Sequence, residues 1–165
     1  EAGIELASGP GWSGVCLDLA RAYFGGRDEK LSLCGRWVVL LGEGAAILIL
    51  DRVRISHAAF VEARFHTFLP ARFSHASGLI KGKENSLHLA FAANGPAVLR
   101  QGIGMPSTPE SPADQVFGWI TKELQHEVVL GTLCTPNGRG RLTIKSDKRE
   151  VRVVTPAGKF GFCYA

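Results

Sequence analysis

The sequence predicts an all-β fold, an antiparallel β-sandwich of roughly ten strands with one or two short helical turns. Apolar residues recur with a period of two along most of the chain, whereas the 3.6-residue period of an amphipathic helix is scarce. Turn signals follow one another at intervals of about 8–12 residues, which is typical of sandwiches and barrels. The 20 glycines and 8 prolines are consistent with so many turns.

The size and composition of the chain favour one folded domain covering residues 1–165. Its 45% hydrophobic and 21% charged residues are ordinary values for a globular protein. No run of about 18 apolar residues occurs, so we expect no membrane span. The formal net charge of +4 is modest, and without a dense block of Lys and Arg we expect no nucleic-acid partner.

The first strands are predicted from apolar runs on both sides of a glycine turn. Arg36–Leu41 and Ala45–Leu50 are nearly all apolar and flank the sequence Gly-Glu-Gly, which indicates a hairpin covered on both faces. The next segment, Phe60–Leu69, alternates cleanly. One of its faces carries Val61, Ala63, Phe65, Thr67 and Leu69, and the other carries Phe60, Glu62, Arg64, His66 and Phe68.

The second half of the chain predicts further hairpins. Residues 79–91 contain a turn near Gly82–Asn85, and a short strand follows at 96–102. Asn137-Gly138 marks a turn between two apolar strands, because both residues adopt positive φ at low cost. Residues 150–164 are expected to form the last hairpin of the chain.

Three segments do not follow the period-two pattern. Leu17–Phe24 and Gln115–Leu124 can each form a helical turn or two. Gly102–Asp114 is rich in Pro and Ser and is expected to be a long loop within the domain, because strand patterns resume after it.

The cysteines and histidines do not predict a metal site. No Cys-x-x-Cys pair occurs, so a zinc ribbon is not expected. The cysteines lie among apolar or small residues and are expected to be buried free thiols, with disulfide bonds as the alternative: Cys16, Cys34, Cys134 and Cys163. The five histidines form neither an i, i+4 pair nor a His-x-His pair. We therefore expect no metal and no cofactor.

Glu62, Arg64 and His66 form the candidate catalytic wall. Side chains two residues apart on a strand are separated by about 7 Å, so the three can line one surface. A carboxylate and a guanidinium beside an imidazole can tune it as a general acid or base. The alternative is an ordinary solvated strand face, whose exposed ion pair contributes about 0.5 kcal/mol to stability.

Arg52 is a second candidate, at the end of an apolar strand. Its guanidinium fork suits a substrate carboxylate. A structural role is the alternative, because strand ends commonly carry charged pairs. The neighbouring Asp51 is expected to pair with Arg36 across the hairpin.

Five segments occur in an order that resembles the C-terminal β-domain of heparinase II/III-like polysaccharide lyases. They are DLARAY, CGRWVVLLGEGAAILILDRVR, EARFHTFLP, FGWITKEL and HEVVLGTLCTP. In that family an Asp-x-x-x-x-Tyr element precedes an Arg-led strand, and a strand ending in Asp-Arg, a Phe-His-Thr-like strand and a Gly-Trp follow. The similar segments run from Asp18 to Pro136, with Tyr23 at the tyrosine position, and cover most of the chain.

The resemblance implies a β-sandwich that packs against an α/α-toroid domain in a larger parent protein. It also implies β-elimination of a uronate-containing acidic polysaccharide, such as a glycosaminoglycan or alginate, and a secreted or periplasmic location. The metal ligands and the His-Asn-Thr element of the family have no counterpart in this sequence. The toroid is also missing, so we expect a polysaccharide lyase only in a longer protein and no catalysis by this chain alone.

Within this interpretation His66 is predicted to be the catalytic residue. The predicted substrate-binding residues are Arg64, Arg52 and Glu62. A lyase cleft must bind a polyanion, and arginine suits carboxylates and sulfates. The alternative function is a stand-alone, non-catalytic carbohydrate-binding or structural β-sandwich module. Exposed coplanar aromatic rings would favour sugar binding, whereas a polar cleft holding His66 and Arg64 would favour the lyase domain.

Overall fold

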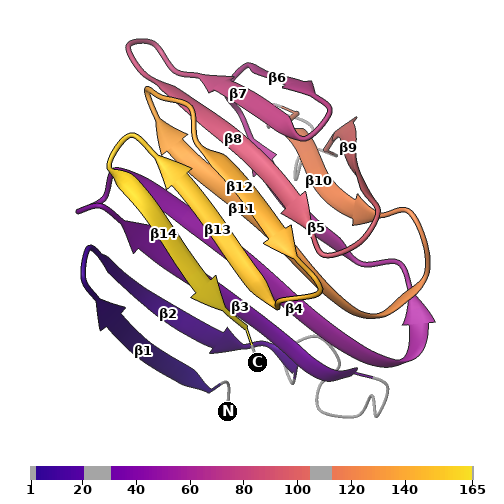
Figure 1. Cartoon of the computed structure of the whole chain (residues 1–165). Helices are drawn as coiled ribbons and strands as arrows, with labels where there is room; N and C mark the ends of the chain where they lie inside the picture. Colours follow the sequence, from indigo (N-terminus) through magenta and orange to yellow (C-terminus); the bar gives the residue numbers. More distant parts are fainter. Residues whose placement is uncertain (1–2, 21–30, 105–112, 165) are drawn as a thin grey trace.

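The computed structural model describes residues 3–20, 31–104 and 113–164. These residues form fourteen β-strands in three antiparallel sheets (Figure 1). The large sheet has eight strands, in the spatial order β1 (Ile4–Gly9), β2 (Trp12–Asp18), β3 (Leu31–Leu41), β4 (Ala46–Ala59), β11 (Gln125–Pro136), β8 (Ser86–Ala93), β7 (Ser77–Lys81) and β6 (Ala71–Ser74).

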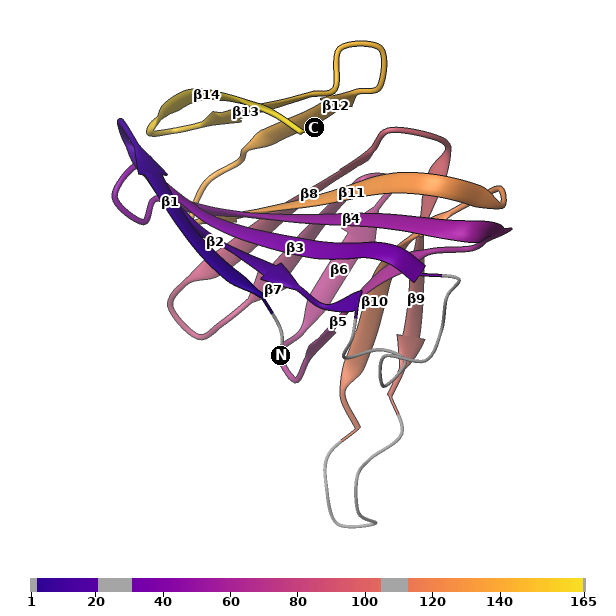
Figure 2. The same ribbon diagram turned by 90° about the horizontal axis from the view of Figure 1, so that it is seen from below.

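Two three-stranded sheets complete the fold. One contains β5 (Glu62–Thr67), β10 (Gln115–Thr121) and β9 (Ala97–Ile103), in that order. The other is the C-terminal sheet, formed by β12 (Arg141–Lys145), β13 (Glu150–Thr155) and β14 (Gly158–Cys163). Figure 2 shows the two small sheets on opposite sides of the large sheet, which forms the middle layer. The predicted all-β sandwich is therefore confirmed, with a third layer added.

Strand β11 shows why the chain forms three layers. Its side chains alternate between the two faces of the large sheet. Val129 packs toward the C-terminal sheet, in a core that includes Val151 of β13. Val128 packs on the opposite face, in a second core that includes Phe117 of β10. A strand that is apolar on both faces must be covered on both, and the two small sheets provide that cover.

The second core is aromatic and is centred on Phe117. Its ring stacks on that of Phe65 in β5 at a centroid distance of 5.5 Å, and the ring of Phe73 in β6 lies 4.7 Å away. The ring of Phe91 in β8 lies 6.3 Å from Phe117 and 5.7 Å from Trp119. These contacts hold the β5–β10–β9 sheet against the large sheet and leave its other face to the solvent.

The hairpin around Gly-Glu-Gly is confirmed, with both arms longer than predicted. Gly42 and Gly44 have φ values of 57° and 91°, which glycine adopts without steric cost. Arg36 faces Asp51 in the register of β3 and β4, and its Nε and Nη2 donate to the Asp51 carboxylate at 2.6 and 2.9 Å. The predicted ion pair is therefore confirmed. The second face is less covered than expected, because Leu40 is exposed.

Four other predicted elements are present at the expected places. The alternating segment forms β5, and the short strand predicted at residues 96–102 forms β9. The hairpins β7–β8 and β13–β14 also form. The turn before β12 contains Asn137 at a φ of 49°. Most of the expected loop Gly102–Asp114 lies outside the described residues.

The prediction of helical turns in Gln115–Leu124 is wrong. Gln115–Thr121 form β10, which pairs with β5 on one side and β9 on the other. Two neighbouring strands satisfy its backbone groups, and Phe117 and Trp119 enter the core, so tertiary packing decides its conformation. The other expected helical segment begins with the end of β2, and residues 21–24, with Tyr23, lie outside the described residues. No helix in the described part of the chain is long and apolar enough to cross a membrane.

The number of strands is fourteen instead of the roughly ten predicted. The strands that the sequence did not reveal include β1, β2 and β6, which are short and partly or largely exposed. Glycine, alanine and serine are frequent in them, and these residues give a weak period-two signal. Short strands without a clear apolar alternation are therefore the elements that a hydrophobic pattern fails to predict.

All four cysteines are free thiols. Cys16, Cys34 and Cys134 are partly buried, whereas Cys163 is exposed. The expectation of a buried thiol is therefore wrong for Cys163, which occupies one of the outward positions of β14. Burial raises the pKa of Cys134 to about 11, so its thiol stays protonated at neutral pH.

Candidate functional site

The outer face of the β5–β10–β9 sheet carries the candidate site. Because the three strands pair in register, their side chains line up in rows across the sheet. One row consists of Arg64 of β5, Gly118 of β10 and Arg100 of β9. The row on one side of it begins with His66, and the row on the other side begins with Glu62. Period-two alternation thus places all the predicted wall residues on one face.

Glu62 lies across Gly118 and holds Arg64. Its Oε2 accepts a hydrogen bond from Arg64 Nη2 at 2.6 Å, and Arg100 Nη1 lies 4.0 Å from the same oxygen. A Cβ atom at position 118 would collide with the Glu62 carboxylate, so this space exists only because residue 118 is a glycine. Glu62 therefore reaches toward both arginines from the neighbouring row.

His66 is held by a carboxylate that the sequence did not indicate. Its Nδ1 forms a hydrogen bond with Oδ2 of Asp114, the residue before β10. A carboxylate accepts hydrogen bonds, so in the neutral imidazole this contact favours the tautomer with its proton on Nδ1, which leaves Nε2 free to accept one. Asp114 is placed in turn by Gly104, whose N–H donates to the Asp114 carbonyl at 2.9 Å. A Cβ atom at position 104 would collide with the Asp114 carboxylate.

The charged groups of this face differ in burial according to their sign. The side chains of Glu62 and Asp114 are each 14% exposed, whereas those of Arg64, His66 and Arg100 are 53%, 55% and 65% exposed. The carboxylates therefore lie against the sheet, and the nitrogen-bearing side chains project into the solvent. A molecule that approaches this face meets mainly N–H donors.

An open depression of about 330 Å³ covers this face. Its lining is Glu62, Arg64, His66, Arg100, Gln101, Gly102, Ile103, Gly104 and Val116. The expectation that Glu62, Arg64 and His66 share one surface is met. Within residues 3–20, 31–104 and 113–164, no group of three or more His, Cys, Asp or Glu side chains could hold a metal ion.

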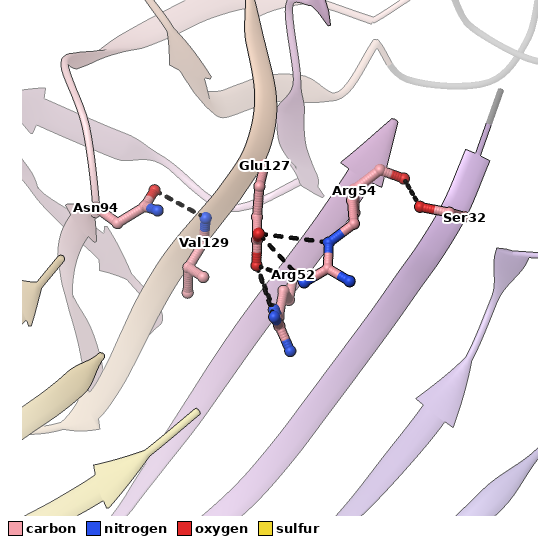
Figure 3. A network of polar contacts seen from close by, with 6 residues as sticks. All are labelled: Ser32, Arg52, Arg54, Asn94, Glu127 and Val129. Carbon is pink, nitrogen blue, oxygen red and sulfur yellow. Dashed lines mark hydrogen bonds and ion pairs between the residues drawn. The ribbon is translucent and has the colours of Figure 1, made fainter. Parts of the chain in front are cut away.

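Arg52 lies elsewhere, on the face of the large sheet that the C-terminal sheet covers. It is 9% exposed, and its Nε and Nη2 donate to Glu127 Oε1 at 2.9 and 2.6 Å (Figure 3). Arg54 Nη2 reaches Glu127 Oε2 at 3.2 Å. The hydrogen bond from Arg52 and then that from Arg54 hold the pKa of Glu127 below its usual value. Arg52 is thus not brought together with Arg64 and His66, and its contact with substrate stays a prediction.

A bulge in β11 positions Glu127. The register of β11 against β4 shifts between Gln125 and Glu127. After the bulge, Asn94 binds β11 at the point where β8 ends. Its Oδ1 accepts a hydrogen bond from the backbone N–H of Val129 at 2.9 Å (Figure 3). On the side where β8 has ended, the Asn94 side chain therefore satisfies the backbone of β11, while β4 pairs with it on the other side and Glu127 is held beside the two arginines.

A cavity of about 420 Å³ lies between the large sheet and the C-terminal sheet. Aromatic rings form much of its lining, from Trp12, Trp37, Phe162 and Tyr164. Trp12 and Phe162 meet edge to face, at a centroid distance of 5.6 Å and an interplanar angle of 88°. Perpendicular rings do not form the coplanar platform on which a sugar ring stacks.

Comparisons of the sequence alone do not place this protein in a family. No protein-family profile matches it, and no curated protein matches it. The structure, in contrast, superimposes on that of a heparinase III gene product with a TM-score of 0.75 and 11% identity, covering 99% of this chain and 27% of that one. The chain has the fold of one part of heparinase III.

Two further solved structures agree. The heparan sulfate lyase HepC from Pedobacter heparinus gives a TM-score of 0.68 at 11% identity, covering 99% of this chain and 28% of that one. A second heparinase III structure gives 0.71 at 11% identity, with 98% and 27% covered. This chain therefore spans about a quarter of the length of the heparinase III structures that it matches. The resemblance to the β-domain of these lyases is confirmed as a shared fold.

Three residues of the candidate site were not predicted: Arg100, Asp114 and Gly118. Arg100 lies on a predicted strand, and alternation along that strand could have shown that it points outward, but not that it faces Arg64. Gly118 was missed because its strand was assigned to a helical turn. Asp114 comes at the end of a loop, where no periodicity exists. Only the pairing of β10 with β5 and β9 brings the three together.

Proposed function

We propose that this chain, as a single domain of a longer protein, is the β-sandwich domain of a heparinase-like polysaccharide lyase. In this role it supports β-elimination of a uronate-containing acidic polysaccharide. The observation that carries the proposal is a histidine oriented by a carboxylate beside two exposed arginines, on a fold shared with heparinase III. Histidine supplies a proton acceptor near neutral pH, and arginine forks bind carboxylates and sulfates.

The reaction cleaves the bond between C4 of a uronate and the glycosidic oxygen. A base removes the proton from C5, next to the carboxylate, and the electron pair forms the C4=C5 double bond. The glycosidic oxygen leaves with the bonding pair and takes a proton from an acid. Donors at the carboxylate stabilise the negative charge that develops there. In our assignment His66 exchanges a proton at Nε2, Arg64 binds the carboxylate, and Glu62 orients Arg64.

The rest of the chemistry belongs to the parent protein in this proposal. The heparinase III structures are much longer than this chain, which covers 27% of them. We propose that an α/α-toroid domain supplies the second proton-transfer group and the opposite wall of the cleft. Because glycosaminoglycans and alginate are extracellular polymers, we also propose that the parent is secreted or periplasmic.

The test compares this chain with the longer parent protein. Both are incubated with heparan sulfate, chondroitin and alginate, and the ultraviolet absorbance of unsaturated uronate products is followed. We expect product from the parent only. His66→Ala in the parent should lower turnover at least about tenfold, which is about 1.4 kcal/mol of barrier. The matched control is His57→Ala, another exposed histidine, on β4 and outside the depression, which should leave the rate unchanged.

Two outcomes would change the proposal. An unchanged rate in His66→Ala removes His66 from the catalytic site. If neither protein forms product but both bind the polysaccharides, the chain is a non-catalytic carbohydrate-binding module, the alternative function for this fold.

A further inference from the structure

The row Arg64–Gly118–Arg100 has a geometry that suits one small anion. Neighbouring strands lie about 4.8 Å apart, so the two arginine backbones are separated by about 10 Å. Between them, β10 contributes no side chain of its own, and the carboxylate of Glu62 lies over Gly118, against the sheet. On the solvent side of this carboxylate, the two exposed guanidinium groups can contact the same external carboxylate or sulfate group.

The charges of the row leave one positive charge to be neutralised. Two arginines stand against one carboxylate, that of Glu62. Glu62 bonds Arg64 at 2.6 Å but lies 4.0 Å from Arg100, which is beyond hydrogen-bond distance. A guanidinium has five N–H donors, so Arg64 keeps donors for a second acceptor. The side chains of both arginines are more than half exposed, at 53% and 65%, and a ligand can reach them.

We infer that Arg64 and Arg100 form a subsite for a single anionic group of a sugar, a carboxylate or a sulfate monoester, held between the two guanidinium groups on the solvent side of Glu62. Glu62 orients Arg64 in this subsite. It also leaves the two arginines with one uncompensated positive charge, which one monoanion neutralises. The identity of the sugar polymer rests on the proposed function. Anion binding by the row does not, because it can be measured on this chain without any lyase reaction.

The chain contains a matched control for this subsite. Arg152 on β13 pairs with Glu150, two residues away on the same strand, as Arg64 pairs with Glu62. Arg152 Nε lies 2.8 Å from Glu150 Oε1. Its side chain is also 53% exposed. Its row across the C-terminal sheet, however, contains Thr143 and Gly161 and no second arginine. The same local ion pair therefore occurs once with and once without an arginine opposite.

The experiment measures binding of oligosaccharides to the 165-residue chain by calorimetry. The probes are an alginate oligosaccharide with carboxylates only, dextran sulfate with sulfates only, and neutral dextran. We expect the anionic probes to bind and neutral dextran not to bind. Arg64→Ala and Arg100→Ala should each raise the Kd about tenfold or more, and Arg152→Ala should change it less than about twofold. Arg64→Lys should bind less tightly than the unmodified chain because it lacks the fork.

Each outcome decides one point. Equal losses of affinity in Arg64→Ala and Arg152→Ala would mean general attraction to a basic surface and would overturn the subsite. Unchanged binding in Arg100→Ala, or binding of neutral dextran, would also overturn it. Binding of only one anionic probe identifies the group that the row takes. Thermal unfolding of each variant excludes a folding defect. Binding that follows this pattern, with no lyase activity in the parent, would keep the subsite and reject the lyase function.

Discussion

At the scale of single residues, Gly118 and Gly104 determine where the charges of the candidate site lie. Each leaves space for a carboxylate, that of Glu62 in one case and that of Asp114 in the other. Both acids therefore lie against the sheet, and the side chains that they bind point outward. The chemistry of this surface depends on two residues that carry no functional group.

A second residue-scale feature, the bonding of Glu127 to Arg52 and Arg54, leads to a prediction about stability. In Glu127→Gln the charge is lost while Arg52 stays buried, so we expect a loss of about 2 kcal/mol at neutral pH. The pKa of Glu127 is lowered in the folded protein, so its contribution is full above the usual value of 4.5 and is lost as the pH falls through the folded pKa. The difference in the free energy of unfolding between Glu127→Gln and the unmodified chain should shrink in that acidic range.

Denaturant unfolding of both proteins at neutral and acidic pH measures this difference. Glu150→Gln is the control, because Glu150 pairs with the exposed Arg152 and such surface pairs contribute little. A loss for Glu127→Gln that is equal at all pH values would show that the carboxylate charge is not the cause.

The sequence predicts some residues of the candidate site and not others for a physical reason. Glu62, Arg64 and His66 belong to one strand, and the period of two fixes their common face. Arg100 and Asp114 reach the same surface only through the pairing of distant strands. The separation of His66 from Asp114 is 48 residues, and no local pattern encodes a contact over that distance. The ion pair of Arg36 and Asp51 was predictable because a short hairpin fixes its register.

At the scale of elements, Gly131 controls how closely β12 packs on β11. A Cβ atom at this position would lie 2.8 Å from Leu142 Cδ2 and 3.0 Å from Ile144 Cδ1, both on β12. We predict that Gly131→Ala destabilises the protein by about 1–3 kcal/mol, because the C-terminal sheet must move outward. Denaturant unfolding measures the loss.

Gly161 provides the control for this prediction. It also lies on a strand, β14, but a Cβ atom there would meet no atom within 4 Å. Gly161→Ala should change the stability by less than about 0.5 kcal/mol. Similar losses for the two variants would indicate an effect of glycine itself and not of the contact between β11 and β12.

The elements that the sequence predicted are those with strong local patterns. β3 and β4 are apolar arms around a glycine turn, and β5 alternates without interruption. β10 was assigned to a helical turn because the pattern of Gln115–Leu124 is compatible with both periods. Its conformation is decided by β5 and β9, which no local pattern reveals.

At the scale of the whole molecule, two separate cores share one sheet. Val128 and Val129 are neighbours in sequence, are each 1% exposed, and belong to different cores. We predict that Val128→Ala and Val129→Ala each cost about 2 kcal/mol and that their effects add within about 0.5 kcal/mol. Adjacent residues in one core would instead show coupling.

The measurement is denaturant unfolding of the two single variants and the double variant. We expect one cooperative transition in each case, since the large sheet belongs to both cores. Strong coupling between the two substitutions, or a transition that splits in two, would contradict this description of the fold.

The all-β class was predictable for the whole molecule, but its three layers were not. Apolar residues on both faces of β11 indicate cover on two sides, yet no residue of β11 specifies which strands supply it. The shared fold with heparinase III at 11% identity illustrates the same point. The fold is retained where most individual residues differ.

The position of β11 between β4 and β8 has a consequence for how the chain acquires its structure. The ribosome produces β4 and β8 well before β11, and until then the two halves of the large sheet have no common hydrogen-bonding partner. Joining them closes chain loops of many residues at once, which makes the folding rate slow compared with that of proteins built from local contacts. Nascent chains that lack β11 expose apolar strand edges and are the species that chaperones would have to protect.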